Sequence, residues 1–151
     1  MNDFKPLDDQ LAGLIGALSP AGRRKLAAEI AKELRKSQQQ RIKQQKSPDG
    51  IPYQARKRQP LRAKSGRIKR AMFAKLRTSR YLKASGRSDA AVVEFTGKVQ
   101  RIARVHQYGL MEKPGKNSKF IKYPERALLG ISEIDIIKID EIILNFINQS
   151  H

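Results

Sequence analysis

The sequence predicts an α+β fold, with N-terminal helices, a small antiparallel sheet with a packed central helix, and a C-terminal helix. Three patterns support this class. Leucines at helical spacing open the chain, two short strand-like runs flank a Gly-Arg-Ser-Asp turn in the middle, and an isoleucine-rich segment follows a serine near the end. The 151 residues are enough for one domain with a sizeable core, so we expect a single domain over 1–151.

The first part of that domain, residues 1–45, is expected to be helical. One helix face is indicated by apolar residues at i, i+4, i+7, i+8 and i+11, namely Leu7, Leu11, Leu14, Ile15 and Leu18. Ser19 and Pro20 then supply an N-cap and a first-turn proline for a second helix. Its apolar stripe consists of Leu26, Ala27, Ile30, Ala31 and Leu34. Between Lys36 and Lys46 the only apolar residue is Ile42, so this half of the helix cannot bury itself by hydrophobic contact.

Residues 46–67 form the second part, which we expect to be a basic arm or loop. It contains three of the seven prolines, two glycines, and basic residues that include Arg56, Lys57, Arg58, Arg62 and Arg67. Such a segment is too polar to build a core, and we expect a partner to order it. The candidates are a neighbouring subunit, an acidic protein surface or DNA, and all five named residues are candidates for assembly contacts.

The third part, residues 68–151, is expected to be an α+β core. Ile68, Met72, Phe73 and Leu76 suggest a short helix or turn, and residues 81–95 predict a hairpin. A helix should follow, with one face made by Val99, Ile102, Ala103 and His106, and with Gly109 as its C-cap. Residues 111–119 are expected to be a loop, and residues 120–123 a strand ending before Pro124.

The closing segment predicts a helix from Ser132, as N-cap, to about Gln149, with acidic residues in its first turn. Its apolar residues wrap about 200° of a helical wheel, where a surface helix needs little more than about 100°. The excess has three explanations: a helix deep in its own core, a strand, or a subunit interface. The interface candidates are Ile139, Ile143 and Phe146.

His106 and the C-terminal His151 are the only histidines, and the chain has no cysteine. Catalysis or metal binding at His106 would therefore depend on carboxylates and hydroxyls, and the nearest acids, Glu94 and Glu112, match no known ligand spacing. We expect a packed, structural histidine, hydrogen-bonded through one ring nitrogen. No phosphate-binding glycine loop is present, so no catalytic residue, metal or cofactor is predicted.

The net charge is +18, and residues 20–83 hold 21 Lys and Arg against 3 Asp and Glu. This excess indicates either a solvated surface or a region that contacts polyanions or acidic protein, and the sequence alone does not choose among these. Because few aromatic residues lie among these charges, a nucleic acid would be held only through its backbone, which leaves non-specific DNA contact open. With neither a signal peptide nor a membrane span in the sequence, we expect a soluble protein made in the cytoplasm, without a membrane partner.

Several short motifs in order carry a resemblance: "DGIPY" before a basic stretch, "VVEF", "IARVHQYG", "YPERALLGIS", and a closing helix with an acidic start. Together they resemble the phage virion morphogenesis family, the tail completion proteins of contractile-tailed temperate phages, over roughly residues 1 to 149. The resemblance implies a non-enzymatic virion protein that forms a ring, which we expect to be a hexamer, at the head-proximal end of the tail. Tail-tube, sheath or head–tail connector proteins would be its neighbours.

The resemblance also implies roles for the motif residues. Gly109 would end a helix in a left-handed conformation, and Pro124 would fix the chain direction after a strand. Arg126 could hold a carboxylate or carbonyl with two hydrogen bonds, and Gly130, beside Leu129, would allow close backbone approach. The alternative from composition is a basic nucleic-acid-binding protein that acts through backbone electrostatics.

Overall fold

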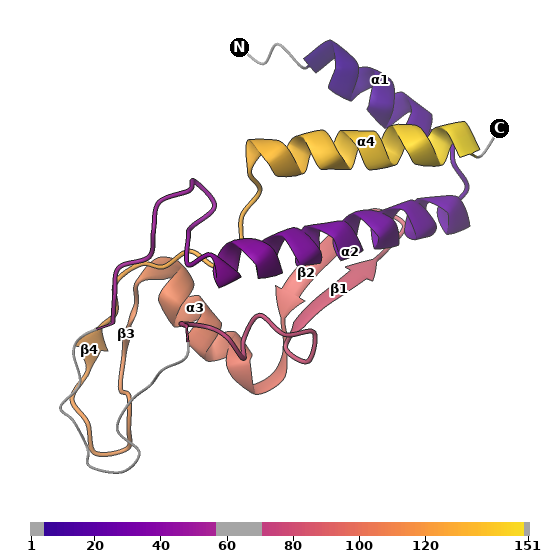
Figure 1. The fold of residues 1–151 in the computed structure, drawn as a ribbon. Coiled ribbons are helices and arrows are strands. Elements are labelled where there is room, and N and C mark those ends of the chain that lie inside the picture. Colours follow the sequence, from indigo (N-terminus) through magenta and orange to yellow (C-terminus); the bar gives the residue numbers. More distant parts are fainter. Residues whose placement is uncertain (1–4, 57–70, 150–151) are drawn as a thin grey trace. The chain divides into compact units, whose positions relative to one another are not determined.

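The structure is a computed structural model that describes residues 5–56 and 71–149 (Figure 1). Its helices are α1 (Lys5–Gly16), α2 (Pro20–Lys43), α3 (Gln100–Tyr108) and α4 (Glu133–Gln149). One two-stranded sheet pairs β1 (Leu82–Gly86) with β2 (Ala91–Phe95), and a second pairs β3 (Met111–Glu112) with β4 (Ile121–Lys122). A short 3-10 turn, η1 (Gly97–Val99), leads into α3. Helices combined with two small antiparallel sheets confirm the α+β class.

The chain divides into two compact units. One, here called the helical unit, comprises Met1–Ser37, Lys83–Glu94 and Ile131–His151. The other, here called the motif unit, comprises Gln38–Leu82 and Phe95–Gly130. Helix α2 contributes residues 20–37 to the helical unit and residues 38–43 to the motif unit.

An apolar cluster forms the core of the helical unit. Leu11 of α1, Leu26 of α2, and Ile143 and Ile147 of α4 are buried there. Partly buried residues pack against them, namely Ile15, Leu18, Ile30, Ile139, Ile142 and Phe146. The two helices predicted at the N-terminus are thus confirmed, and their leucine spacing arises because each presents one face to α4.

Serine caps begin two of the helices, as the sequence predicted. The Gly22 amide donates to Ser19 Oγ at 3.0 Å at the start of α2. At the start of α4, the Asp135 amide donates to Ser132 Oγ at 3.2 Å, and the Ser132 amide donates to Asp135 Oδ2 at 3.0 Å. This reciprocal pair satisfies two amides that the helix leaves free, and the hydroxyl of Ser37 in α2 donates to the same buried carboxylate.

The β1–β2 hairpin lies against α2 within the helical unit. The Arg87 amide donates to the Ala90 carbonyl at 2.8 Å, which closes the predicted Gly-Arg-Ser-Asp turn. A Cβ built on Gly86 would lie 2.3 Å from the Ala28 nitrogen and 2.6 Å from the Arg24 carbonyl oxygen. Only glycine therefore allows the end of β1 to approach the α2 backbone this closely.

Two local predictions are wrong, and two alternatives are now decided. Residues 111–119 are not wholly loop, because Met111 and Glu112 form β3 and pair with Lys122 and Ile121. Of the short helix or turn predicted around Met72, Phe73 and Leu76, the structure shows the turn, while Ile68 lies outside the described residues. On α3, Ile102 is 49% exposed while Val105 is buried, so the core-facing side is rotated from the predicted one. The closing segment is a helix, as predicted, so the alternative of a strand is excluded.

Candidate functional site

The motif residues of the second half of the chain meet in the motif unit, where irregular backbone is held by buried side chains. Gln107 of α3 is the central example. Its Oε1 accepts hydrogen bonds from the Leu128 and Leu129 amides at 2.8 and 2.9 Å, and its Nε2 donates to the Leu129 carbonyl at 2.9 Å. One side chain thus replaces the partner strand that residues 128–129 lack.

The polar end of α2 binds the same segment from another direction. Arg41 donates to the Leu128 carbonyl at 2.9 Å and to Gln38 Oε1, which also accepts from the Gly130 amide at 3.1 Å. Gln38 is only 3% exposed. The C-terminal half of α2 has few apolar residues because its buried side chains make polar contacts instead. Ile42 is the fully buried apolar side chain of this half.

Arg126 connects this site to the basic arm at residues 54–55. It is 6% exposed, and its guanidinium donates to the Gln54 carbonyl at 2.8 Å and the Ala55 carbonyl at 3.2 Å. Its own amide donates to the His106 carbonyl at 2.7 Å. Burial, and secondarily the charge of Arg56, lower its pKa. The two hydrogen bonds expected of the Arg126 guanidinium are thus donated to two backbone carbonyls. These bonds fix the position of the chain just before Arg56.

His106 is packed among aromatic rings. Its ring makes edge contacts with Phe73, at a centroid distance of 4.9 Å, and with Tyr123, at 5.3 Å. Burial, together with the charges of Arg126 and Arg56, lowers the pKa of His106 to about 4, so the ring is neutral at pH 7. The packing role agrees with the prediction, but the expected hydrogen bond is absent at Nδ1, which is buried without a partner among the described residues.

Two motif glycines permit close contacts within the motif unit. Gly109 caps α3 with φ +64°, and a Cβ there would lie 3.0 Å from the Glu125 nitrogen. A Cβ on Gly130 would lie 2.4 Å from Pro48 Cγ. Both glycine roles are therefore seen in the structure, since each lets a motif segment pack against a distant part of the unit.

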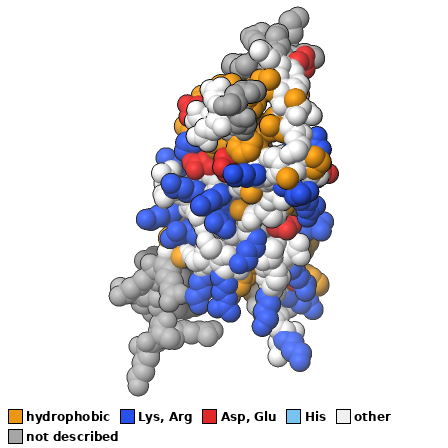
Figure 2. Space-filling view, turned by 90° about the vertical axis from the view of Figure 1, so that its right-hand side faces the viewer, with side chains coloured by type: hydrophobic (Ala, Val, Ile, Leu, Met, Phe, Trp, Pro, Cys, Tyr) orange, Lys and Arg blue, Asp and Glu red, His pale blue; other side chains and the backbone are white. Residues whose placement is uncertain are grey.

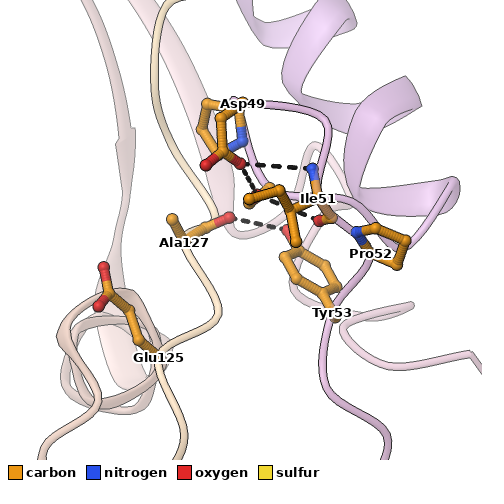
Figure 3. Close-up of a pocket in the computed structure, with 8 residues that line it drawn as sticks. Asp49, Ile51, Pro52, Tyr53, Glu125 and Ala127 are labelled. Atoms are coloured by element: carbon orange, nitrogen blue, oxygen red, sulfur yellow. Dashed lines mark hydrogen bonds between the residues drawn. The ribbon is translucent and has the colours of Figure 1, made fainter.

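An open pocket of about 460 Å³ lies beside this network (Figure 3). Its wall includes Pro52 and Tyr53, whose hydroxyl donates to the Ala127 carbonyl at 2.9 Å. Asp49 accepts hydrogen bonds from the Ser47 hydroxyl and the Ile51 amide, and these bonds lower its pKa. Glu125 is the second carboxylate of the lining, so the pocket has apolar walls and two acidic groups.

The predicted site residues thus fall into three groups. Arg126, His106, Gly109, Gly130 and the half-buried Pro124 and Leu129 belong to the motif unit. Ile143 is buried in the core of the helical unit, and Ile139 and Phe146 pack against it. Of the basic arm, Arg56 is exposed, whereas Lys57, Arg58, Arg62 and Arg67 lie outside the described residues.

Sequence reasoning did not identify Gln38, Arg41 or Gln107 as site residues. Gln107 stood within the quoted motif, and the only signal for the other two was the apolar-poor end of α2.

Over the described residues, no group of three or more His, Asp or Glu side chains is placed to hold a metal ion, and no helix is long and apolar enough to cross a membrane. Figure 2 shows Lys and Arg side chains recurring over one face, with few acidic ones.

The polar side chains at the centre of the site bind backbone amides and carbonyls, so their role there is structural. The chain belongs to the phage virion morphogenesis family, whose model matches residues 2–148. It is similar to Tail completion protein S of Escherichia phage P2, with 54% identity over 145 residues, which cover 95% of this chain and 97% of that protein. No solved structure matches the chain.

Proposed function

We propose that the protein completes the phage tail as a non-enzymatic part of the virion. The observation that carries this proposal is the nearly full-length similarity to a tail completion protein. The site geometry supports it, because the buried polar groups of Gln107, Arg126 and Gln38 are used to shape backbone. The neutral, packed His106 likewise fits a structural role.

The finished particle would contain the protein as a six-fold ring at the head-proximal end of the tail, where the head joins. The free subunit would be monomeric, because a charge of +18 on each copy opposes self-association. A particle structure with six symmetric copies at that end is the expected result. A lone copy or a dimer in the particle would contradict the ring.

The basic arm would contact an acidic surface of a neighbouring tail protein. Arg126 supports this role, because its bonds to the Gln54 and Ala55 carbonyls fix the backbone of the arm beside the exposed Arg56. Acidic protein is favoured over DNA, because a channel that gripped the genome with many Lys and Arg would resist its ejection. Added salt should weaken the contact, since exposed charges are screened beyond about 8 Å at physiological ionic strength.

Reversing the charge of the arm tests this role. Changing Arg56, Lys57 and Arg58 together to Glu should abolish incorporation into tails while the isolated subunit keeps its melting temperature. The matched control makes the same charge change on exposed positions of α2, at Arg24, Lys25 and Lys32, and should be incorporated. Incorporation is measured in tails purified from a phage strain whose own copy of the gene is disabled.

The high positive charge favours a second candidate, a protein that binds nucleic acid through the backbone. The same triple change separates the two. If it eliminates duplex binding at about 150 mM salt, where surface charges are already screened, but tails still complete and join heads, the arm serves DNA and the preference for acidic protein is wrong.

A further inference from the structure

The β3–β4 hairpin, labelled in Figure 1, belongs to the motif unit. It exposes apolar and basic side chains together. Met111 pairs with Lys122 across the two strands, so their side chains share one face of the ribbon. Lys113 continues that face, with its ammonium 4.8 Å from the centre of the Phe120 ring. Met111 is 61% and Phe120 60% exposed. We call Met111, Lys113, Phe120 and Lys122 the basic face of the hairpin.

Helix α4 of the helical unit exposes the opposite combination. Apolar and acidic residues recur at i, i+4, i+7, i+8 and i+11, a spacing that places them on one side of the helix: Glu133, Ile137, Asp140, Glu141 and Leu144. Ile137 is 58% exposed and Leu144 43% exposed, and they lie away from the buried Ile143 and Ile147. We call these five residues the acidic face of α4.

The acidic residues of this face have no partner within the described part of the chain. Among the described residues, the salt bridges of α4 include Lys138 with Glu33 of α2 but none of Glu133, Asp140 or Glu141. The last twenty residues hold four acidic residues and one basic residue, in a chain that is otherwise strongly basic. Exposed isoleucine and leucine with polar residues around them are typical of a contact surface, and the unpaired carboxylates would form its polar rim.

We propose that these two faces bind each other between copies, so that the basic face of one subunit's hairpin docks on the acidic face of the next subunit's α4. The inference rests on the proposed ring and identifies its contact. The faces are complementary in charge, and each offers large apolar side chains, Met111 and Phe120 on one and Ile137 and Leu144 on the other. A phosphate backbone would neutralise the lysines but would leave Met111 and Phe120 uncovered.

Two different faces in contact make a head-to-tail interface, which closes into a ring when the rotation between subunits permits. Local attraction between the faces also offers a way for subunits of charge +18 to associate. The contact is weak until the tail end concentrates the subunits, which agrees with a monomeric free protein.

Cross-linking can locate the contact, because the chain has no cysteine of its own. Lys122→Cys combined with Glu141→Cys, supplied to tails and treated with a short bis-maleimide, should give a ladder of cross-linked multimers that ends at the ring size. Each single cysteine variant gives no ladder. The matched control pairs Lys122→Cys with Lys32→Cys on exposed α2, and should also give none. A cross-link that leaves the doubly substituted chain at the mass of one subunit would overturn the proposal.

Charge reversal then tests the pairing itself. Variant one carries Lys113→Glu with Lys122→Glu, and variant two carries Asp140→Lys with Glu141→Lys. Each alone places like charges opposite each other and should reduce incorporation into tails by at least about tenfold. Supplied together, they should restore it, because every contact between alternating copies again joins opposite charges. An alternating ring needs an even number of subunits, which a hexamer provides.

A control on the same hairpin, Lys116→Glu with Lys119→Glu, makes the same charge change off the basic face and should be incorporated normally. If both single variants are incorporated normally, or if their mixture stays as defective as each alone, the pairing is wrong. Complementation of the disabled phage by the unaltered protein distinguishes a wrong interface from a wrong proposed function. If it does not restore infectious particles to the disabled phage, tail completion itself is wrong; if it does, only the interface is at fault.

Discussion

The helical unit and the motif unit are stabilised in different ways. The helical unit packs regular helices around Leu11, Leu26, Ile143 and Ile147. The motif unit also has fully buried apolar residues, such as Ile42 and Leu128, but its irregular segment at residues 126–130 depends on hydrogen bonds from side chains to backbone. Helices satisfy their own backbone groups, so only their faces need burial, whereas an irregular segment needs a specific partner for each group.

This difference predicts how each unit responds to substitution. An apolar core accepts side chains of similar volume, because the hydrophobic effect is not directional. A hydrogen-bonding side chain accepts few replacements, because the amides it served remain buried. The motif unit should therefore tolerate fewer substitutions than the helical unit. The exception is a position in the helical unit where two backbone segments are in close contact.

Gly86 is that exception and should give the largest effect. In Gly86→Ala the new Cβ would meet backbone atoms of α2 at 2.3 and 2.6 Å, and backbone cannot move aside as a flexible side chain can. We expect a loss of about 4 kcal/mol or more in the free energy of unfolding, measured by denaturant titration. The control is Gly13→Ala, where no atom lies within 4 Å and alanine should stabilise α1 by about 0.5 to 1 kcal/mol. Equal effects of the two changes would contradict the close approach.

Leu26, which is 2% exposed, tests the apolar core of the helical unit. Leu26→Ala should cost about 3 kcal/mol, because it loses apolar burial and leaves a cavity. Leu26→Met keeps the volume and should cost less than about 1.5 kcal/mol. Thermal denaturation compares the two, and a methionine variant as unstable as the alanine variant would mean that this core is not tolerant.

Gln107 tests the hydrogen-bonded segment of the motif unit. Gln107→Leu keeps the size but leaves the Leu128 and Leu129 amides without an acceptor, at a cost of about 1 to 3 kcal/mol. Hydrogen exchange should accelerate at these two amides. Gln107→Glu retains an acceptor for both and should protect them better than leucine. Unchanged exchange in the leucine variant would show that the segment is held in another way.

His106 should give the smallest effect, visible as a dependence on pH. Its pKa is about 4 in the folded protein, against about 6.5 in an unfolded chain, so the unfolded state binds more protons between these values. Stability is therefore lost as pH falls from about 6.5 towards 4, on the order of 1 kcal/mol after allowing for partial solvent exposure. The measurement is the free energy of unfolding across this range.

His106→Gln is the matched variant, because glutamine does not titrate. Its stability should be lower than that of the unaltered protein at pH 7, and the histidine-dependent loss between pH 6.5 and 4 should disappear. Particle yield should fall only in proportion to the melting temperature. A variant that keeps its melting temperature yet gives no infectious particles would refute the packing role.

Local signals determined much of the fold in advance. Ser19 and Ser132 start helices, Gly109 ends one in a left-handed conformation, and the Gly-Arg-Ser-Asp turn closes a hairpin. Each depends on residues a few positions apart, which a sequence displays directly. The two-residue β3 was missed for the converse reason, since Met111 and Glu112 become a strand only by pairing with Lys122 and Ile121, beyond an intervening loop.

The sequence by itself also revealed the family, through motif residues whose order along the chain could be recognised before their contacts were known. Only the tertiary structure showed that Gln107, Gln38 and Arg41 bind the backbone of residues 128–130, from as far as 92 positions away in the sequence. It likewise showed that the Arg126 side chain binds the backbone of residues 54–55. Periodicity reports which side of a helix is apolar, so it described the end of α2 correctly as unable to bury itself by hydrophobic contact. It carries no information on which distant carbonyl or amide a buried polar side chain will bind, because that choice is made by the folded geometry alone.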